Sequence, residues 1–413
     1  MSDAPILRGL SVRDLRGYRE LDAAFEPGPQ LVWGPNAAGK TSLLEAIVLL
    51  AWGRSHRTST EGELVRWGEE LARIEARVGR PETPPEARDT VEVALVRTST
   101  GGARKRIRVN GVARRAAGLA GVLRTVMFAP EEMLLVAGSP SLRREALDRL
   151  AGQRSPAYVR ELATYGRALQ QRNGLLRAIR DEQATRAELR FWDQTFLESG
   201  SAVREERQRL LLALAAPLAD AHREIAPEEA AAEPLRLAYA SNAPQHPGES
   251  VRDALARRLE ETAEKEAWNG TTLIGPHRDD LVFEMGGRAM ASFASRGQQR
   301  TAILAFKLAE LDLLTALDGR PPLLLLDDVF SELDPERRAH LVRRIAALPQ
   351  AFVTTTTLDD IDPALRSVGT AWEVVPDAGG GAALRSIEAP GKGPARRPGA
   401  EPDAPPVAQA VEP

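Results

Sequence analysis

The sequence predicts an α/β fold built from two distant chain segments, with a mainly helical domain inserted between them. Three observations predict it. A glycine-rich loop at 34–41 lies between an apolar strand and an apolar helix. A second apolar strand, at 323–326, ends in two acids. Between these segments, residues 141–268 show few strand signals and are rich in Leu, Ala, Arg and Glu.

Length and composition place the chain among ordinary globular proteins. It has 413 residues, enough for two or three domains, with 43% hydrophobic residues, 27% charged residues and a net charge of −3. The lack of cysteine excludes disulfides, thiolate catalysis and Cys-ligated metals. The sequence contains no run of 18 apolar residues, so no membrane-spanning helix is expected. The N-terminal residues lack the apolar segment of a signal peptide, so no signal peptide is expected.

The predicted elements follow from periodicity and turn residues. The N-terminal half begins with strand, turn and strand over 5–33, then a helix from Thr41, strands at 74–78 and 91–97, and a hairpin turn at Asn110-Gly111. Two or three long helices are expected between 141 and 225, with a helix start at Ser155-Pro156 and a break or kink at Pro217. A strand at 235–240, a helix to Trp268 and strands at 323–326 and 351–357 complete the order.

These elements predict four regions. Residues 1–140 and 269–388 are expected to form the two halves of one α/β head, and residues 141–268 a helical lever. Residues 389–413 are rich in Pro, Gly, Ala and charge, and they are predicted to be a disordered tail because they cannot bury enough apolar surface.

The glycine-rich loop matches the P-loop pattern G-x-x-x-x-G-K-[ST] in full. Its glycines let backbone N–H groups curl around phosphate oxygens, and the following helix points its positive end at the same anion. The lysine supplies charge to the β- and γ-phosphates, and the threonine hydroxyl is a ligand for Mg²⁺. The loop therefore predicts that ATP and Mg²⁺ bind at Gly34, Pro35, Asn36, Ala37, Ala38, Gly39, Lys40 and Thr41.

The strand at 323–326 is the matching Walker B candidate. It presents acids at its carboxyl end, where ligands of α/β folds bind. Asp327 is predicted to hold Mg²⁺, and Asp328 to orient the attacking water. Lys40 and Asp327 are 287 residues apart, much farther than in a minimal P-loop domain, so a whole domain must lie between them.

Two further motifs flank this strand. The run Ser295-Arg296-Gly297-Gln298-Gln299-Arg300 precedes a helix and resembles the signature motif of ABC-type ATPases, and Ser331-Glu332-Leu333-Asp334 resembles their D-loop. The order of motifs is also that of the ABC superfamily, which implies an ABC-type P-loop ATPase head. In this superfamily the signature motif reaches the γ-phosphate from the opposite subunit.

Longer blocks resemble the RecF family over roughly residues 5–375. They are LRGYREL near the start, GRSHRT at 53–58, FAPEEMLLVAGSPSLRREALD at 128–148, GPHRDDL at 275–281, and the composite SRGQQR…LLLLDDVFSELD. The resemblance implies a cytoplasmic ATP-dependent homodimer that binds duplex or gapped DNA and acts in repair and replication. It also implies cooperation with RecO and RecR in loading RecA onto single-stranded gaps.

The resemblance also assigns roles to single residues. Nucleotide and Mg²⁺ contacts fall on Asn36, Gly39, Lys40, Thr41 and Ser42, the Walker B and catalytic acid roles on Asp327 and Asp328, and the trans-acting role on Ser295, Gly297 and Gln298. Asp328 stands where many relatives of the wider superfamily have Glu, and Thr355 lies near the position of their switch histidine. Both departures predict slow hydrolysis. His56 and Arg57 receive no role.

Two basic stretches are candidates for DNA contact. Arg104, Lys105, Arg106 and Arg108 crowd one predicted hairpin, and strand alternation puts the three arginines on one face. Residues 143–190 carry eleven arginines against six acids. No base-reading motif is present, so backbone recognition is expected. A solvated face with Glu/Arg pairs is the alternative for both stretches.

Four other functions compete with a DNA-repair switch. A transport or translation-type ABC ATPase is disfavoured by the long spacing between motifs and by the helical insert. A chromosome-structuring SMC relative would need a longer coiled coil, and a nuclease-linked head would need a further domain. A protein-docking switch, in which an ATP-driven dimer binds partners and touches DNA little, remains the alternative.

Overall fold

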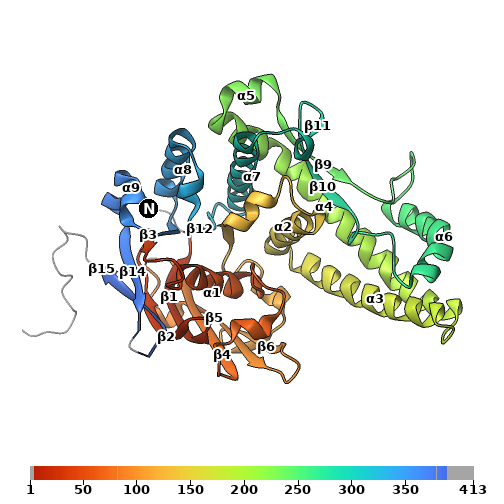
Figure 1. Ribbon diagram of the computed structural model, residues 1–413, viewed down its shortest axis with the longest axis horizontal. Coiled ribbons are helices and arrows are strands. Elements are labelled where there is room, and N and C mark those ends of the chain that lie inside the picture. Colours follow the sequence, from red (N-terminus) through yellow and green to blue (C-terminus); the bar gives the residue numbers. More distant parts are fainter. Residues whose placement is uncertain (1–3, 81, 378, 388–413) are drawn as a thin grey trace, which may run out of the picture.

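The computed structural model describes residues 4–80, 82–377 and 379–387, which form a head and a projecting helical arm (Figure 1). The tail predicted at 389–413 lies outside the described residues. The described residues form three β-sheets. In this part of the chain, no helix is both long and apolar enough to cross a membrane.

The central sheet brings together strands from both ends of the chain. Its order is β15-β14-β3-β13-β12-β8, parallel except for β15. The strands are β3 (Gly28–Trp33), β8 (Thr125–Phe128), β12 (Leu323–Asp327), β13 (Gln350–Thr355), β14 (Thr370–Pro376) and β15 (Ala382–Ile387). Strands β12 and β13 are buried along their whole length because helices or another sheet cover both faces. The predicted strand at 323–326 is confirmed, and the strand predicted at 351–357 is present with the bounds 350–355.

Helix α1 (Lys40–Trp52) packs between this sheet and an antiparallel one. The side chains of β12 alternate between two hydrophobic clusters. Leu323 and Leu325 face the α1 side, whereas Leu324 and Leu326 face α7 (Arg296–Ala316) on the other side. Because α1 is covered on both sides, it is apolar around nearly its whole circumference.

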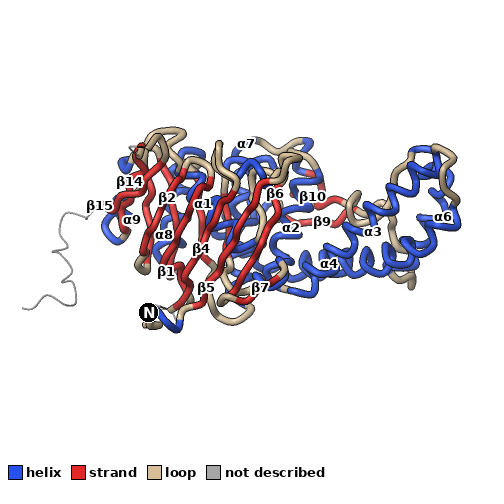
Figure 2. The backbone as a smooth tube through the Cα atoms, turned by 90° about the horizontal axis from the view of Figure 1, so that it is seen from below, coloured by secondary structure: helices blue, strands red, loops and turns tan. Residues whose placement is uncertain are grey.

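The antiparallel sheet has the order β2-β1-β4-β5-β6-β7, and Figure 2 shows its outer face uncovered by helices. Its strands are β1 (Ile6–Leu15), β2 (Tyr18–Ala24), β4 (Leu71–Gly79), β5 (Asp89–Arg97), β6 (Ala103–Val109) and β7 (Val112–Arg114). Asn110 and Gly111 have φ values of 52° and 74°. Both are positive, as a two-residue type I′ hairpin requires, which confirms the predicted turn.

The arm is built on a helical hairpin, with one further helix at its base and another beside it. Its helices are α2 (Pro140–Arg154), α3 (Pro156–Arg180), α4 (Leu189–Ile225) and α6 (Val251–Asn269). Ser155 caps α3 by accepting a hydrogen bond from Tyr158 N at 3.2 Å, as its position before Pro156 predicts. Of the break or kink predicted at Pro217, the break is wrong, because α4 continues through this residue to Ile225. Packing of its C-terminal half against α7 outweighs the one hydrogen bond that proline cannot donate.

The base of the arm is continuous with the head. Strand β9 (Leu235–Ala240) pairs with β10 (Asp280–Met285), which also pairs with β11 (Arg288–Ala289), so one sheet joins both sides of the boundary proposed at residue 268. The short α5 (Pro227–Ala232) connects α4 to β9. Buried side chains of α4 share a core with α7. The four-region division of the chain remains a prediction.

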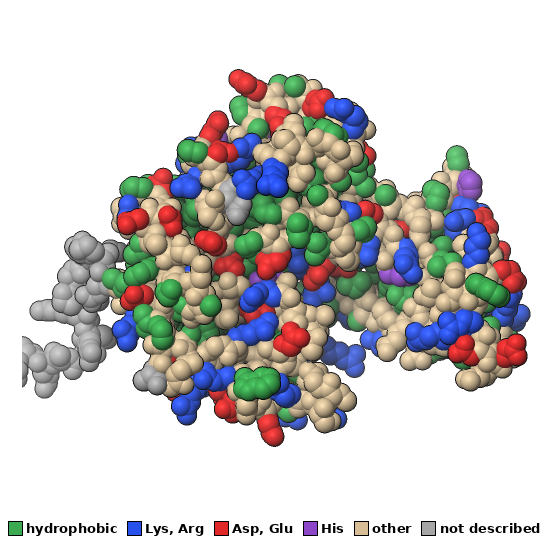
Figure 3. Space-filling model, viewed as in Figure 1, with side chains coloured by type: hydrophobic (Ala, Val, Ile, Leu, Met, Phe, Trp, Pro, Cys, Tyr) green, Lys and Arg blue, Asp and Glu red, His purple; other side chains and the backbone are tan. Residues whose placement is uncertain are grey.

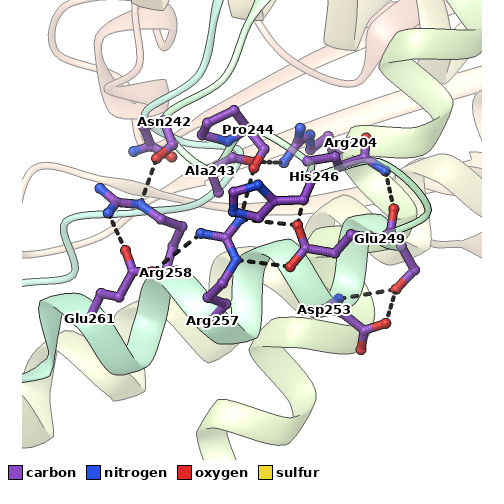
Figure 4. Close-up of polar contacts among 12 residues, drawn as sticks. Arg204, Asn242, Ala243, Pro244, His246, Glu249, Asp253, Arg257, Arg258 and Glu261 are labelled. Atoms are coloured by element: carbon purple, nitrogen blue, oxygen red, sulfur yellow. Dashed lines mark hydrogen bonds and ion pairs between the residues drawn. The ribbon is translucent and has the colours of Figure 1, made fainter.

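Arginine side chains fasten the loop between β9 and α6 to the arm (Figure 4). Arg257 of α6 donates to the carbonyl of Pro244 at 2.9 Å and contacts the Glu249 carboxylate at 2.9 Å. Arg204 of α4 donates to the carbonyl of Ala243 at 2.6 Å. The guanidinium of Arg257 and the backbone N–H of His246 lower the pKa of Glu249 to about 2.

A buried polar network fills the arm next to the GPHRDD segment. Arg207 pairs with Asp148 at 2.8 Å, and Tyr165 Oη lies 2.6 Å from His277 Nδ1. His277 Nε2 lies 3.3 Å from the carbonyl of Thr272, so the neutral ring with its proton on Nε2 satisfies both partners. Burial lowers the pKa of His277 to about 4.

We expect His277 to make the protein less stable as the pH falls from about 6.5 to about 4. Over this range the unfolded chain takes up a proton at this histidine and the folded chain does not. The free energy of unfolding therefore falls by at most about 3 kcal/mol. Urea denaturation of wild type and His277→Gln across this range measures the effect. The variant should show a shallower loss of unfolding free energy, and an unchanged slope would contradict the assignment.

Candidate functional site

The loop between β3 and α1 has the backbone of an anion cradle. Gly34, Ala37 and Gly39 have φ values of 152°, 63° and 117°. A Cβ on Gly34 would lie 2.6 Å from the carbonyl oxygen of Val374, so β14 leaves no room for a side chain there. Positive-φ residues interspersed along the loop turn backbone N–H groups toward one concavity, which favours phosphate.

Lys40 begins α1 and is almost fully buried. Its ammonium donates to the carbonyls of Gly34 at 2.7 Å and Pro35 at 2.9 Å, so the lysine folds back along the loop. Burial lowers the pKa of Lys40, and the nearby carboxylates Asp328 and Asp327 oppose this shift. The two predicted motifs are therefore close enough to interact electrostatically although 287 residues separate them.

Asp327 ends β12 and Asp328 follows it, and a threonine on the neighbouring strand contacts both residues. Thr354 of β13 is fully buried and donates to Asp327 Oδ1 at 2.6 Å. The same hydroxyl accepts the backbone N–H of Asp328 at 3.0 Å. Asp328 adopts a left-handed conformation with φ of 52°, which is uncommon outside glycine. Thr354 thus fixes the Asp327 carboxylate and the strained peptide that follows it.

The P-loop and the two acids line one pocket. Its lining consists of Asn36, Ala37, Gly39, Lys40, Thr41, Ser42, Arg57, Pro130, Asp327 and Asp328. Gly34, Pro35 and Ala38 shape the loop beside it, while Arg57 and Pro130 are lining residues that the sequence reasoning did not assign. In the sequence, the one indication of a functional role for these two residues is that they lie in the blocks GRSHRT and FAPEEM.

Arg57 is held at the pocket by a buried acid on α1. Ser55 donates to Glu45 Oε1 at 2.5 Å and accepts the backbone N–H of Arg57 at 3.0 Å. Glu45 is fully buried and also accepts from Arg16 at 2.9 Å. Burial would raise the pKa of Glu45, but hydrogen bonds from Arg16 and Ser55 outweigh it and hold the pKa below its usual value.

The signature-like residues lie at the N-terminus of α7, away from the pocket lining. Ser295 caps the helix by accepting from Gln298 N at 3.2 Å, and Gln298 Oε1 accepts from Ser295 N at 3.0 Å. This is a capping box. A Cβ on Gly297 would approach only Ser295 Oγ, at 3.8 Å, so no neighbouring side chain crowds this position.

The pocket suits a nucleoside triphosphate and a magnesium ion. The left-handed loop, a buried ammonium and Arg57 provide cationic and N–H donors for phosphate oxygens. The hydroxyls of Thr41 and Ser42 and the carboxylates of Asp327 and Asp328 are oxygen ligands of the kind that Mg²⁺ prefers. Thr354 bonds only one oxygen of Asp327 and leaves the other for a cation.

The predicted DNA residues divide between two faces of β6. Arg104, Arg106 and Arg108 are exposed on the outer face of the antiparallel sheet. Lys105 lies on the opposite side, where its ammonium donates to the carbonyl of Gly53 at 2.5 Å and pairs with Glu61. The structure therefore brings three of the four predicted residues together.

Many arginines of the second basic stretch, residues 143–190, form ion pairs inside the protein. Arg143 pairs with Asp280 at 2.8 Å, Arg149 with Glu132 at 2.5 Å and Arg172 with Glu266 at 2.7 Å. Other arginines of α3 are exposed, as Arg160, Arg167 and Arg177 illustrate. Figure 3 shows acidic and basic side chains interspersed over the visible face of the molecule.

Comparison with known proteins gives consistent matches along the chain. The sequence pattern of the RecF/RecN/SMC N terminal domain matches residues 6–373. A protein of Herpetosiphon aurantiacus named DNA replication and repair protein RecF is 41% identical over 371 residues, which cover 86% of this chain and 94% of that protein.

Solved structures agree with these matches. That of the recombination mediator protein RecF-ATP in the RecFOR pathway has a TM-score of 0.80 and 28% identity, covering 94% of this chain and 99% of that one. The Smc head domain of Pyrococcus furiosus, with 15% identity and a TM-score of 0.51, covers 93% of this chain and 96% of that one and shares the fold alone. The predicted fold, an ABC-type head with a helical insertion, is confirmed.

We expect Thr354→Val to raise the Mg²⁺ concentration needed for nucleotide binding by roughly tenfold, because the variant no longer orients Asp327. Calorimetric titration of a nonhydrolysable ATP analogue at increasing Mg²⁺ measures this. Thr355→Val is the matched control, since the Thr355 hydroxyl bonds the carbonyl of Thr357. Equal Mg²⁺ dependence in both variants would contradict the role of Thr354.

Proposed function

This chain belongs to the RecF family, and from that membership we propose that it is an ATP-driven, DNA-binding switch of replication and repair. The observation that carries the proposal is the meeting of Lys40, Thr41, Asp327 and Asp328 at one pocket, although they come from opposite ends of the chain. Such a pocket binds and positions a triphosphate beside acids, which is the arrangement of an ATPase.

The pocket residues divide the work on ATP. Lys40 and Arg57 neutralise phosphate charge, and the loop N–H groups from Gly34 to Gly39 cradle the phosphates. Thr41 and Asp327 hold Mg²⁺, which when bound offsets charge on the phosphate oxygens. Asp328 orients the attacking water. Because Asp328 is one methylene shorter than Glu and Thr355 carries no charge, we expect slow hydrolysis, suited to resetting a switch.

The placement of the signature-like residues supports the proposal of an ATP-dependent dimer. Ser295, Gly297 and Gln298 lie away from the pocket of their own chain, at the N-terminus of a 21-residue helix. A helix N-terminus attracts anions. We infer that these residues contact the γ-phosphate held by a second copy of the chain, so that ATP joins two heads and hydrolysis releases them.

DNA contact is proposed at the arginine face of β6. Arg104, Arg106 and Arg108 are exposed and contribute charge to phosphates without reading bases. Through this contact the ATP-bound dimer would bind duplex or gapped DNA and, with RecO and RecR, help to load RecA onto single-stranded gaps. The similar solved structure of RecF with ATP is that of a recombination mediator in the RecFOR pathway, which supports this assignment.

The alternative is a protein-docking switch with little direct DNA contact. It is favoured by the pairing of Lys105 with Glu61, and by Glu92, which lies opposite Arg108 in the sheet register. Both reduce the positive potential on the hairpin. In this alternative the ATP-driven dimer presents a protein-binding surface.

We expect Mg-ATP to strengthen binding to gapped DNA, and Lys40→Met to abolish the increase while leaving the fold intact. Fluorescence anisotropy of labelled gapped DNA, with and without Mg-ATP, measures this for both proteins. Binding that ATP does not change would separate the pocket from DNA and favour the docking switch.

Charge reversal on β6 tests the DNA surface. Arg106→Glu should weaken binding roughly uniformly across sequences and reduce the salt dependence of the binding constant. Arg13→Glu is the matched control, because Arg13 lies on the same sheet but already pairs with Glu20 and Asp22. Equal losses in the two variants would argue against a local DNA site.

A further inference from the structure

A side chain at the start of α8 (Pro335–Ala347) joins the two motifs that flank the Walker B strand. The guanidinium of Arg337 donates to Thr301 Oγ1 from Nε at 2.9 Å and from Nη2 at 2.6 Å. Thr301 lies in the second turn of α7, directly after the signature-like segment. The contact therefore connects residues on either side of β12.

Thr301 is also hydrogen-bonded to the signature-like segment. Its side chain is fully buried, and its hydroxyl donates to the carbonyl of Gly297 at 3.1 Å. A hydroxyl has one proton and two lone pairs. The bond to Gly297 uses the proton and the two bonds from Arg337 use the lone pairs, so every hydrogen-bonding position of Thr301 is occupied.

The other side of Arg337 holds the D-loop-like segment Ser331–Asp334. Asp334 caps α8 by accepting the backbone N–H of Arg337 at 3.0 Å, and its carboxylate also pairs with the Arg337 guanidinium. The neighbouring Arg338 donates to the carbonyl of Phe330 at 2.8 Å. One arginine thus bonds the last residue of this segment and a hydroxyl tied to Gly297.

We propose that Arg337 and Thr301 are positioning residues that hold the signature-like and D-loop-like segments in one fixed arrangement for docking against a second copy of the chain. The inference rests on the ATP-driven dimer of the proposed function. In such a dimer both segments belong to the surface that closes over the partner's nucleotide. A fixed arrangement lowers the cost of association, because neither segment has to be ordered during docking.

Neither residue lines the nucleotide pocket of its own chain. Loss of the link should therefore leave nucleotide binding to the monomer unchanged and weaken only the association of two nucleotide-bound heads. A bond that merely supports the fold would instead change thermal stability and nucleotide binding together. The two roles are therefore separable by experiment.

The test compares Thr301→Val, which keeps the shape and loses the hydroxyl, with Thr301→Ser, which keeps the hydroxyl. Sedimentation velocity of the full chain over a range of concentrations, with Mg²⁺ and a nonhydrolysable ATP analogue, gives the dimer dissociation constant. We expect Thr301→Val to raise it roughly tenfold and Thr301→Ser to match wild type. Analogue affinity at low protein concentration and thermal midpoints should stay near wild type for both.

Arg337→Met removes the same hydrogen bonds by changing the partly exposed partner, and it replaces Thr301→Val in the test if that variant does not fold. Its matched control is Arg343→Met on the same helix, because the Arg343 guanidinium contacts His340 one turn away. We expect weaker dimerisation for Arg337→Met alone. Unchanged dimerisation in the Thr301 and Arg337 variants, or parallel loss of analogue binding, would overturn the inference. A wild-type chain that stays monomeric with the analogue would instead refute the proposed dimer itself.

Discussion

Burial of α1 between two sheets is the constraint on which the rest of the head depends. The helix can be apolar on nearly every side only because the central sheet covers one face and the antiparallel sheet the other. Its first residue is Lys40, so the packing that stabilises the head also fixes the end of the P-loop. Beyond the first turn, Glu45 is the polar exception on this helix, and its ion pair with Arg16 satisfies it.

A second buried contact ties the arm to this frame. Glu132 lies just after the pocket residue Pro130 and pairs with Arg149 of α2 at 2.5 Å and with Lys307 of α7 at 2.5 Å. Lys307 also pairs with Glu310 at 3.1 Å. Removing one member would leave an uncompensated buried charge, which costs more than the pair contributes. The first arm helix and the helix bearing the signature-like residues therefore share one anchor beside the nucleotide pocket.

Sequence alone predicts the parts of this structure that local chemistry determines. The P-loop, the acids after β12 and the Asn110-Gly111 turn each need particular residues at a fixed spacing. A helix break at Pro217 does not occur because tertiary packing of α4 outweighs a local preference against proline within helices. The sequence could not distinguish Lys105 and the paired arginines of 143–190 from residues that are free to contact DNA. Charge counts do not show which acidic partner the fold places beside each basic side chain. Contacts between segments that are distant in the sequence bring Arg57 and Thr354 to the site, so no local pattern identifies these two residues.

The capping box at α7 indicates how a helix start can serve both its own chain and an anion. Ser295 Oγ accepts the Gln298 N–H, which uses a lone pair and stabilises the first turn. The hydroxyl proton remains available for donation, and the helix dipole favours negative charge at the same end. Gly297 adds no side chain that would crowd this hydroxyl. The cap that orders α7 therefore leaves the hydroxyl proton of an exposed serine free for donation, so binding a phosphate there would require no rearrangement of the helix that presents it.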